Sequence, residues 1–193
     1  DALIGSSGSS FHKLMRNNGD GTFTNVTAGS GFDSFGGTSI EWNTRDFNND
    51  GHLDIIGGGA IMYGNGDLTF FPDDDAPDNG AIGDLNNDGF LDIVNYGAYI
   101  NNANANHWLT VNLIGTASNK NGIGAKVYVT SALGTQMREI RSGDGFKYMS
   151  SLNAHFGLGA DSTWDLVVVH WPSGDIDQLY GPAPDGSVTI TEG

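Results

Sequence analysis

The sequence DFNNDGHLDI at residues 46–55 returns almost unchanged as DLNNDGFLDI at residues 84–93. Each copy has oxygen-bearing side chains at positions 1, 3, 5 and 9 and a glycine at position 6. Calcium takes about six to eight oxygen ligands, and alternate residues of a chain that wraps around the ion point toward it. The glycine permits the sharp turn that this wrapping needs. The pattern therefore predicts two calcium-binding loops.

The predicted ligands have the same spacing in both loops. Loops rich in Asp, Asn and Gly also form plain β-turns, because these side chains bond to their own backbone. A plain turn has no evident need for Asp at position 9, and both copies carry one, so we favour two Ca²⁺ sites. The predicted ligands are the side chains of Asp46, Asn48, Asp50 and Asp54 with the carbonyl of His52, and the side chains of Asp84, Asn86, Asp88 and Asp92 with the carbonyl of Phe90.

The spacing resembles that of an EF-hand loop only in part. Position 12 is Gly57 in one copy and Asn95 in the other, where an EF-hand has a bidentate glutamate. The apolar segments 53–56 and 91–94 are short and rich in β-branched residues, which indicates strands and not helices. Each loop is thus expected to connect two strands.

Composition favours an all-β protein. The chain has 193 residues with 30 glycines and 16% charged residues, and no stretch of ten residues shows helical periodicity. A net charge of −15 argues against nucleic acid as a partner. No apolar run is long enough to span a membrane, and there is no cysteine to indicate a redox compartment. The start at Asp1, without methionine or a signal sequence, suggests a mature product or a fragment.

The first half of the chain is repetitive. Residues 14–23 align with residues 61–70, and both read as a hairpin with an Asn-Gly-Asp turn. A third repeat begins at residues 95–102 and breaks off, while residues 1–10 are expected to be a linker or a frayed edge strand. Strand, loop, strand and hairpin together make about one four-stranded blade.

The second half has longer alternating segments. Six or more strands with glycine-bearing turns between them are expected there, which is typical of a β-sandwich. We expect two domains, residues 1–102 and 103–193, with the junction near residues 101–106. The predicted strands cover residues 108–114, 125–130, 136–141, 166–171, 176–180 and 188–190.

Both halves resemble known families. The repeats resemble the FG-GAP or VCBS repeats of integrin-type β-propellers, and the rest resembles the ASPIC/UnbV domain that follows such repeats in the cartilage acidic protein family and its bacterial relatives. The resemblance implies about two blades of an incomplete propeller followed by a sandwich, in an extracellular, secreted or cell-surface protein without a shared enzymatic activity. The C-terminal segments that carry it are residues 106–109, 118–125, 138–145, 155–159 and 171–174.

Catalytic motifs are absent from the sequence. There is no GxSxG elbow, no cysteine and no HExxH motif, and residues 122–126 lack the spacing of a phosphate-binding loop. His155 and His170 lie in apolar surroundings and are expected to be hydrogen-bonded structural residues. We therefore expect no enzyme.

Two charged clusters leave alternatives open. Asp73–Asp75 with Asp78 is a solvated turn, or it completes a calcium shell or meets a basic partner. Arg138, Arg141 and Lys147 form a salt-bridged sheet face, or they receive an acidic glycan or carboxylate.

Three functions fit these observations. The favoured one is a secreted, calcium-binding adhesion or recognition module that binds an extracellular protein or glycan. The alternative is a structural subunit that self-assembles into a filament or matrix, because open blade edges invite strand pairing between copies. The third is a non-catalytic fragment of a larger extracellular enzyme.

Overall fold

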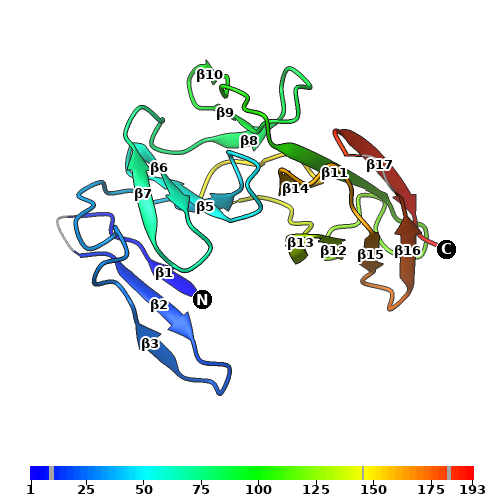
Figure 1. Ribbon diagram of the computed structural model, residues 1–193, viewed down its shortest axis with the longest axis horizontal. Helices are drawn as coiled ribbons and strands as arrows, with labels where there is room; N and C mark the ends of the chain where they lie inside the picture. The colour runs from blue at the N-terminus through cyan, green and yellow to red at the C-terminus, as the bar shows by residue number, and fades with distance from the viewer. Residues whose placement is uncertain (9–10, 145, 182–183) are drawn as a thin grey trace.

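The computed structural model describes residues 1–8, 11–144, 146–181 and 184–193. Within these ranges the chain forms 17 strands and no helix, and hence no helix that could cross a membrane (Figure 1). The strands form five sheets, none of which closes on itself. The prediction of an all-β protein is confirmed for the described residues.

The N-terminal half contains three small antiparallel sheets. Their orders are β1-β2-β3, β4-β5-β6-β7 and β10-β9-β8. The strands are β1 (Ala2–Ile4), β2 (Lys13–Asn17), β3 (Phe23–Asn25), β4 (Asn43–Arg45), β5 (Asp54–Gly57), β6 (Ala60–Gly64), β7 (Phe70–Asp73), β8 (Ala81–Gly83), β9 (Asp92–Val94) and β10 (Ala98–Tyr99).

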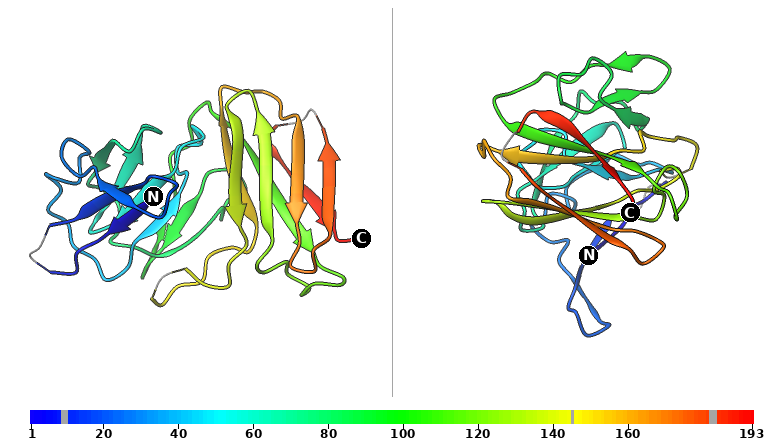
Figure 2. Two further views of the ribbon diagram at one scale, coloured as in Figure 1. Left: turned by 90° about the horizontal axis from the view of Figure 1, so that it is seen from below. Right: turned by 90° about the vertical axis from the view of Figure 1, so that its right-hand side faces the viewer.

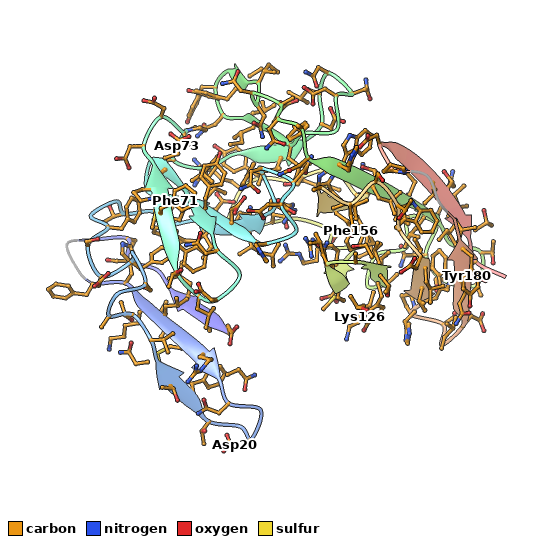
Figure 3. The ribbon with its side chains drawn as sticks, viewed as in Figure 1. Asp20, Phe71, Asp73, Lys126, Phe156 and Tyr180 are labelled. Carbon is orange, nitrogen blue, oxygen red and sulfur yellow. The ribbon has the colours of Figure 1, made fainter. Side chains whose placement is uncertain are left out.

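Both predicted hairpins form. Strand β2 pairs with β3, and β6 pairs with β7, around the Asn-Gly-Asp turns. The hairpin β2–β3 projects from the rest of the chain with Asp20 at its tip (Figure 3). At the chain start, β1 is an edge strand paired with β2, as one of the two expectations had it; Ser9 and Ser10 of that segment lie outside the described residues.

The C-terminal half contains two sheets that share one apolar core (Figure 2). Strand β11 pairs antiparallel with β14 and parallel with β17, while the other sheet has the order β13-β12-β15-β16. The six predicted strands form, and a seventh, β14, was not predicted. The strands are β11 (His107–Ile114), β12 (Lys126–Ser131), β13 (Gly134–Glu139), β14 (Ala154–Gly159), β15 (Leu166–His170), β16 (Ile176–Tyr180) and β17 (Gly186–Thr191).

A buried carboxylate near the C-terminus joins two turns of this half. Glu192 is 3% exposed and accepts hydrogen bonds from the backbone N of Thr116 and Ser118, at 2.7 and 2.6 Å, and from the hydroxyls of Ser118 and Ser173, both at 2.6 Å. Burial acts to raise the pKa of Glu192, but the hydrogen bonds from Ser118, Ser173 and Thr116 outweigh it and lower the pKa to about 2.

We expect Glu192→Gln to lower the melting temperature at pH 7 and to remove part of the acid sensitivity of the protein. The folded state binds the Glu192 proton more weakly than the unfolded chain, so its stabilisation is complete above about pH 4.5 and is lost as pH falls toward 2. Thermal melts from pH 7 to pH 3 measure both effects. The matched control is Glu139→Gln, because Glu139 is exposed at the end of β13, and equal melts of the two variants would refute the role of Glu192.

Candidate functional site

The two predicted calcium loops share most of their internal hydrogen bonds; the second also has one from the backbone N of Asp88 to Oδ1 of Asp84, at 3.2 Å. The aspartate at position 1 accepts from the backbone N of the glycine at position 6, at 2.9 Å in the first loop and 2.8 Å in the second. The asparagine at position 3 donates to the aspartate at position 5, at 2.9 and 2.8 Å. Position 4 has a positive φ in both loops, 58° at Asn49 and 61° at Asn87, which Asn tolerates better than most residues. The two loops, which are similar in sequence, therefore also have similar backbone conformations.

The aspartate at position 9 ties each loop to neighbouring backbone. Asp54 accepts from the backbone N of Phe47 at 2.8 Å and of Gly64 at 2.9 Å. Asp92 accepts at 2.8 Å from the backbone N of Leu85 and of Asn101. This aspartate therefore also has a role that a plain turn could use, because its hydrogen bonds tie the loop to neighbouring backbone.

The first loop buries negative charge. Asp46 and Asp54 are 1% and 0% exposed. Burial, reinforced by the charge of Asp50, raises the pKa of Asp46 to about 6. Burial also raises the pKa of Asp54 to about 8, against the opposing backbone hydrogen bonds. One oxygen of Asp46, Oδ1, is buried without a hydrogen-bond partner in the described structure. A hard cation at this loop would supply the missing partner, so the donor set fits calcium.

The carboxylates of each loop do not converge on one point. In the described ranges, no group of three or more His, Asp or Glu side chains lies close enough to hold a metal ion. The structure brings together the side chains of positions 3 and 5 but turns those of position 9 toward backbone donors. Of the two residues predicted to bind through their carbonyls, His52 is exposed and Phe90 is buried. Calcium binding at the ten residues stays a prediction.

The first loop is docked onto the C-terminal half through Asn49. Its side-chain N donates to the carbonyl of Gly89 in the second loop at 3.0 Å, and its Oδ1 lies 2.7 Å from Nε2 of His155. Its own carbonyl accepts from the backbone N of Gly159 at 2.7 Å. Asn49 is fully buried and therefore joins both loops to β14.

His155 is neutral and holds one tautomer. Because the side-chain N of Asn49 donates to a carbonyl, its oxygen accepts, and Nε2 of His155 carries the proton. Burial, aided by the charges of Arg138 and Arg45, lowers the pKa of His155 to about 3. The expected structural role is confirmed for His155, whereas His170 is exposed at the end of β15 with its ring 5.1 Å from that of Tyr128.

Strand β14 presents two different faces. Ala154, Phe156 and Leu158 belong to the C-terminal core, while the alternate residues face the first loop. A Cβ on Gly157 would collide with Oδ2 of Asp46 and with the backbone of Asn49. Gly157 therefore allows the loop to approach the strand, which is a known use of glycine in strands.

The glycines at position 6 are also contact points. A Cβ on Gly51 would meet the side chain of Leu133, and one on Gly89 would meet the indole ring of Trp108. Both loops thus pack against the C-terminal half at the residue where they turn.

Hydrogen bonds from asparagine side chains stabilise the segment that connects the two halves. The side-chain N of Asn101 donates to the carbonyls of Phe47 and Leu91, at 2.8 and 3.1 Å. The side-chain N atoms of Asn104 and Asn106 both donate to the carbonyl of Asn48, at 2.8 and 2.9 Å. Sequence reasoning placed the junction here but missed these contacts, since the loop carbonyls they reach are distant in the chain.

The two charged clusters of the sequence have different surroundings in the structure. Asp73–Asp75 is exposed, which agrees with a solvated turn, and Asp78 accepts from the backbone N of Gly58 at 2.8 Å. Lys147 lies 5.5 Å from the ring of Tyr148, whereas Arg141 pairs with Asp144 at 3.0 Å. The resemblance segment 138–145 ends on Gly145, which lies outside the described residues.

A scan against protein families matches residues 1–57 to an FG-GAP-like repeat. Residues 115–193 match the family described as ASPIC and UnbV. A search of curated proteins finds no significant match. The glycines and histidine at residues 155–159, which carried part of the sequence resemblance, are the residues that receive the first loop. The chain thus carries an FG-GAP-like repeat followed by an ASPIC and UnbV domain.

Proposed function

We propose that the chain is a secreted or cell-surface calcium-binding module that recognises an extracellular protein or glycan. The N-terminal sheets would be about two blades of a propeller that further blades complete, and the C-terminal pair of sheets would be a β-sandwich. Calcium in the loops would stabilise the blades and their docking onto the sandwich. No catalytic role is included in this proposal.

The observation that carries the calcium proposal is the buried, unpartnered Oδ1 of Asp46. It lies in a loop whose donors are those that calcium prefers, and the second loop repeats two of its hydrogen bonds, although there Oδ1 of Asp84 accepts from the backbone N of Asp88 at 3.2 Å. Leaving a buried carboxylate oxygen without a partner costs free energy, which a cation would offset. The side chains of Asp46, Asn48 and Asp50 would hold the ion in the first loop, and those of Asp84, Asn86 and Asp88 in the second. The side chains of Asp54 and Asp92, and the carbonyls of His52 and Phe90, would complete the two sets.

We expect 10 mM calcium to stabilise the folded chain relative to EDTA. If each site binds with a Kd of about 10⁻⁴–10⁻³ M, as in other extracellular modules, one site contributes about 1.4–2.7 kcal/mol at that concentration. For a chain of this size the melting temperature would rise by roughly 3–10 °C per site. Differential scanning calorimetry with calcium, magnesium and EDTA measures the shift.

The variants Asp50→Asn and Asp88→Asn separate the two sites. Each keeps the size of the side chain and removes one charge, so each should lose about half of the calcium-dependent shift while its melting temperature in EDTA stays near that of the wild type. The matched control is Asp67→Asn in the exposed turn of the β6–β7 hairpin, which should keep the full shift. A wild-type chain that melts at the same temperature in calcium and in EDTA refutes the proposal.

Self-assembly into a filament is the alternative function, and the open edges of the five sheets favour it. Exposed aromatic side chains lie on or beside the N-terminal strands, among them Phe71, Tyr96 and Tyr99. A filament former would elute in the void volume of a size-exclusion column and be visible by electron microscopy. Elution as a monomer in calcium would leave the recognition module as the better proposal.

A further inference from the structure

Three of the eight Lys and Arg residues of this acidic chain meet in one cavity between its two halves. The cavity has a volume of about 180 Å³. Arg45, in β4, comes from the N-terminal half, and Arg138 and Arg141 come from β13 and the segment after it. A chain with a net charge of −15 has no general reason to collect guanidinium groups, so their meeting needs a local explanation.

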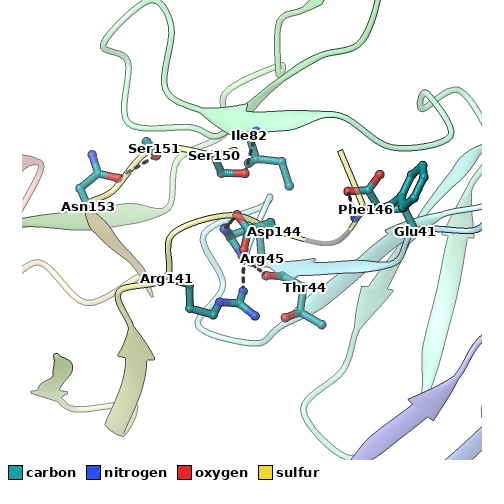
Figure 4. A network of polar contacts seen from close by, with 10 residues as sticks. All are labelled: Glu41, Thr44, Arg45, Ile82, Arg141, Asp144, Phe146, Ser150, Ser151 and Asn153. Carbon is teal, nitrogen blue, oxygen red and sulfur yellow. Dashed lines mark hydrogen bonds and ion pairs between the residues drawn. The ribbon is translucent and has the colours of Figure 1, made fainter. Parts of the chain in front are cut away.

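One carboxylate of the chain already occupies part of this cluster. Asp144 is 5% exposed and binds Arg45 through Oδ2 at 2.5 Å and Arg141 through Oδ1 at 3.0 Å (Figure 4). Two arginines on one carboxylate show the kind of group that this environment accepts.

The third arginine has no such partner. In the described residues, Arg138 forms no ion pair, although the charge of Asp46 in the first loop acts on it and opposes the lowering of its pKa by burial. Its guanidinium donates to the carbonyl of Met137 at 3.0 Å and to Oε1 of Gln136 at 3.1 Å. It also lies 5.1 Å from the ring centre of Phe156, which fixes its position. Its remaining N–H groups are available to an acceptor in the cavity.

The other lining residues suit a hydroxylated ligand. Thr44, Ser151 and Asn153 line the cavity with polar side chains, and Arg141, 48% exposed, marks its access to solvent. Glu139 also lines the cavity, and of the three guanidinium groups there only those of Arg45 and Arg141 are paired with the carboxylate of Asp144, so an acidic ligand suits the site. A cavity of about 150 Å³ is known to hold benzene, so this one has room for a six-membered ring whose substituents extend toward the opening at Arg141.

We propose that this cavity binds a six-membered sugar ring that carries one carboxylate, with the carboxylate on Arg138 and the hydroxyls on Ser151 and Asn153. A long polyanion is disfavoured, because the net charge of −15 repels it outside the cavity. The proposal rests on the proposed recognition function, for which it supplies the chemistry of a ligand. The cavity includes none of the predicted calcium ligands, although the charge of Asp46 acts on Arg138, so the two proposals are kept apart by titrating the chain in EDTA, where the calcium sites are empty.

Isothermal titration of the whole chain with glucuronate, and with glucose as the neutral probe, tests the proposal. We expect saturable binding of glucuronate and none of glucose. Arg138→Met should weaken glucuronate binding about ten- to a hundredfold, since it removes a charge-assisted pair. Lys126→Met is the matched control and should bind like the wild type, because Lys126 is exposed at the start of β12 and lies outside the cavity.

Titration with methyl glucuronide tells whether the natural ligand is the end of a glycan chain or a free sugar acid. If it binds as tightly as glucuronate, the natural ligand is a glycan terminus; if only glucuronate binds, it is a free sugar acid. No binding of either compound, equal binding of glucose, or an Arg138→Met affinity equal to wild type would each overturn the proposal. Should Arg138→Met fail to fold, the more exposed Arg141→Gln applies the same test, with an expected loss of several-fold.

Discussion

Gly157→Ala is expected to destabilise the chain by about 3 kcal/mol or more, although it adds a single methyl group. The new Cβ would collide with Oδ2 of Asp46 and with the backbone of Asn49, which cannot move aside as a flexible side chain could. Strand β14 cannot retreat either, because it is paired with β11 on one edge and carries core residues on its other face. The first loop would have to leave β14.

Loss of docking has a recognisable signature in urea. The wild type should unfold with both halves coupled, whereas Gly157→Ala should show two transitions, because each half has its own apolar core. The fluorescence of Trp108, whose indole packs on Gly89 of the second loop, reports the separation. Proteolysis within residues 101–106 should also become faster, as the asparagines there lose the loop carbonyls that they bind.

Gly186→Ala is the matched control for this experiment. Gly186 is also in a paired strand, β17, and no atom lies within 4 Å of the position that its new Cβ would take. This change should alter the free energy of unfolding by less than about 1 kcal/mol. A single wild-type-like transition in Gly157→Ala would mean that the loop does not lie on β14.

The sequence alone predicts those elements whose structure depends on residues that are close in the chain. The two loops, the two hairpins and six C-terminal strands follow from repeated turn residues and from alternation. Strand β14 was missed because Gly157 and Gly159 lower β-propensity, although Ala154, Phe156 and Leu158 alternate as a half-buried strand should. The glycines that obscured the strand are those that let the first loop approach it.

The candidate site shows the same limit. Asn49 and Asn87 occupy the same position of identical NND triplets, so the sequence cannot rank them. Only the folded chain distinguishes them: Asn49 is fully buried, and Asn87 is exposed. Likewise Asp144 reads as part of a glycine-rich turn, yet it pairs with Arg45, 99 residues away. Contacts of this kind depend on how the two halves meet, which no local pattern encodes.

Asn49→Ala is expected to cost about 3–7 kcal/mol. The change leaves two buried groups without partners, the carbonyl of Gly89 and Nε2–H of His155, at about 1–3 kcal/mol each. It also places alanine at a φ of 58°, which adds roughly 1 kcal/mol. Asn49→Gly removes the side chain without this backbone strain. It should therefore be more stable than Asn49→Ala by only the strain energy of roughly 1 kcal/mol.

The second loop provides the control, because Asn87→Ala makes the same change at the same position and nearly the same φ, 61°. Asn87 is exposed, and its side chain has no hydrogen-bond partner among the described residues, so its replacement should cost only the backbone term of roughly 1 kcal/mol. Urea unfolding in EDTA measures the difference without any contribution from calcium. If the two variants were equally stable, Asn49 would be a turn residue like its counterpart, and the docking of the first loop would have to depend on other contacts.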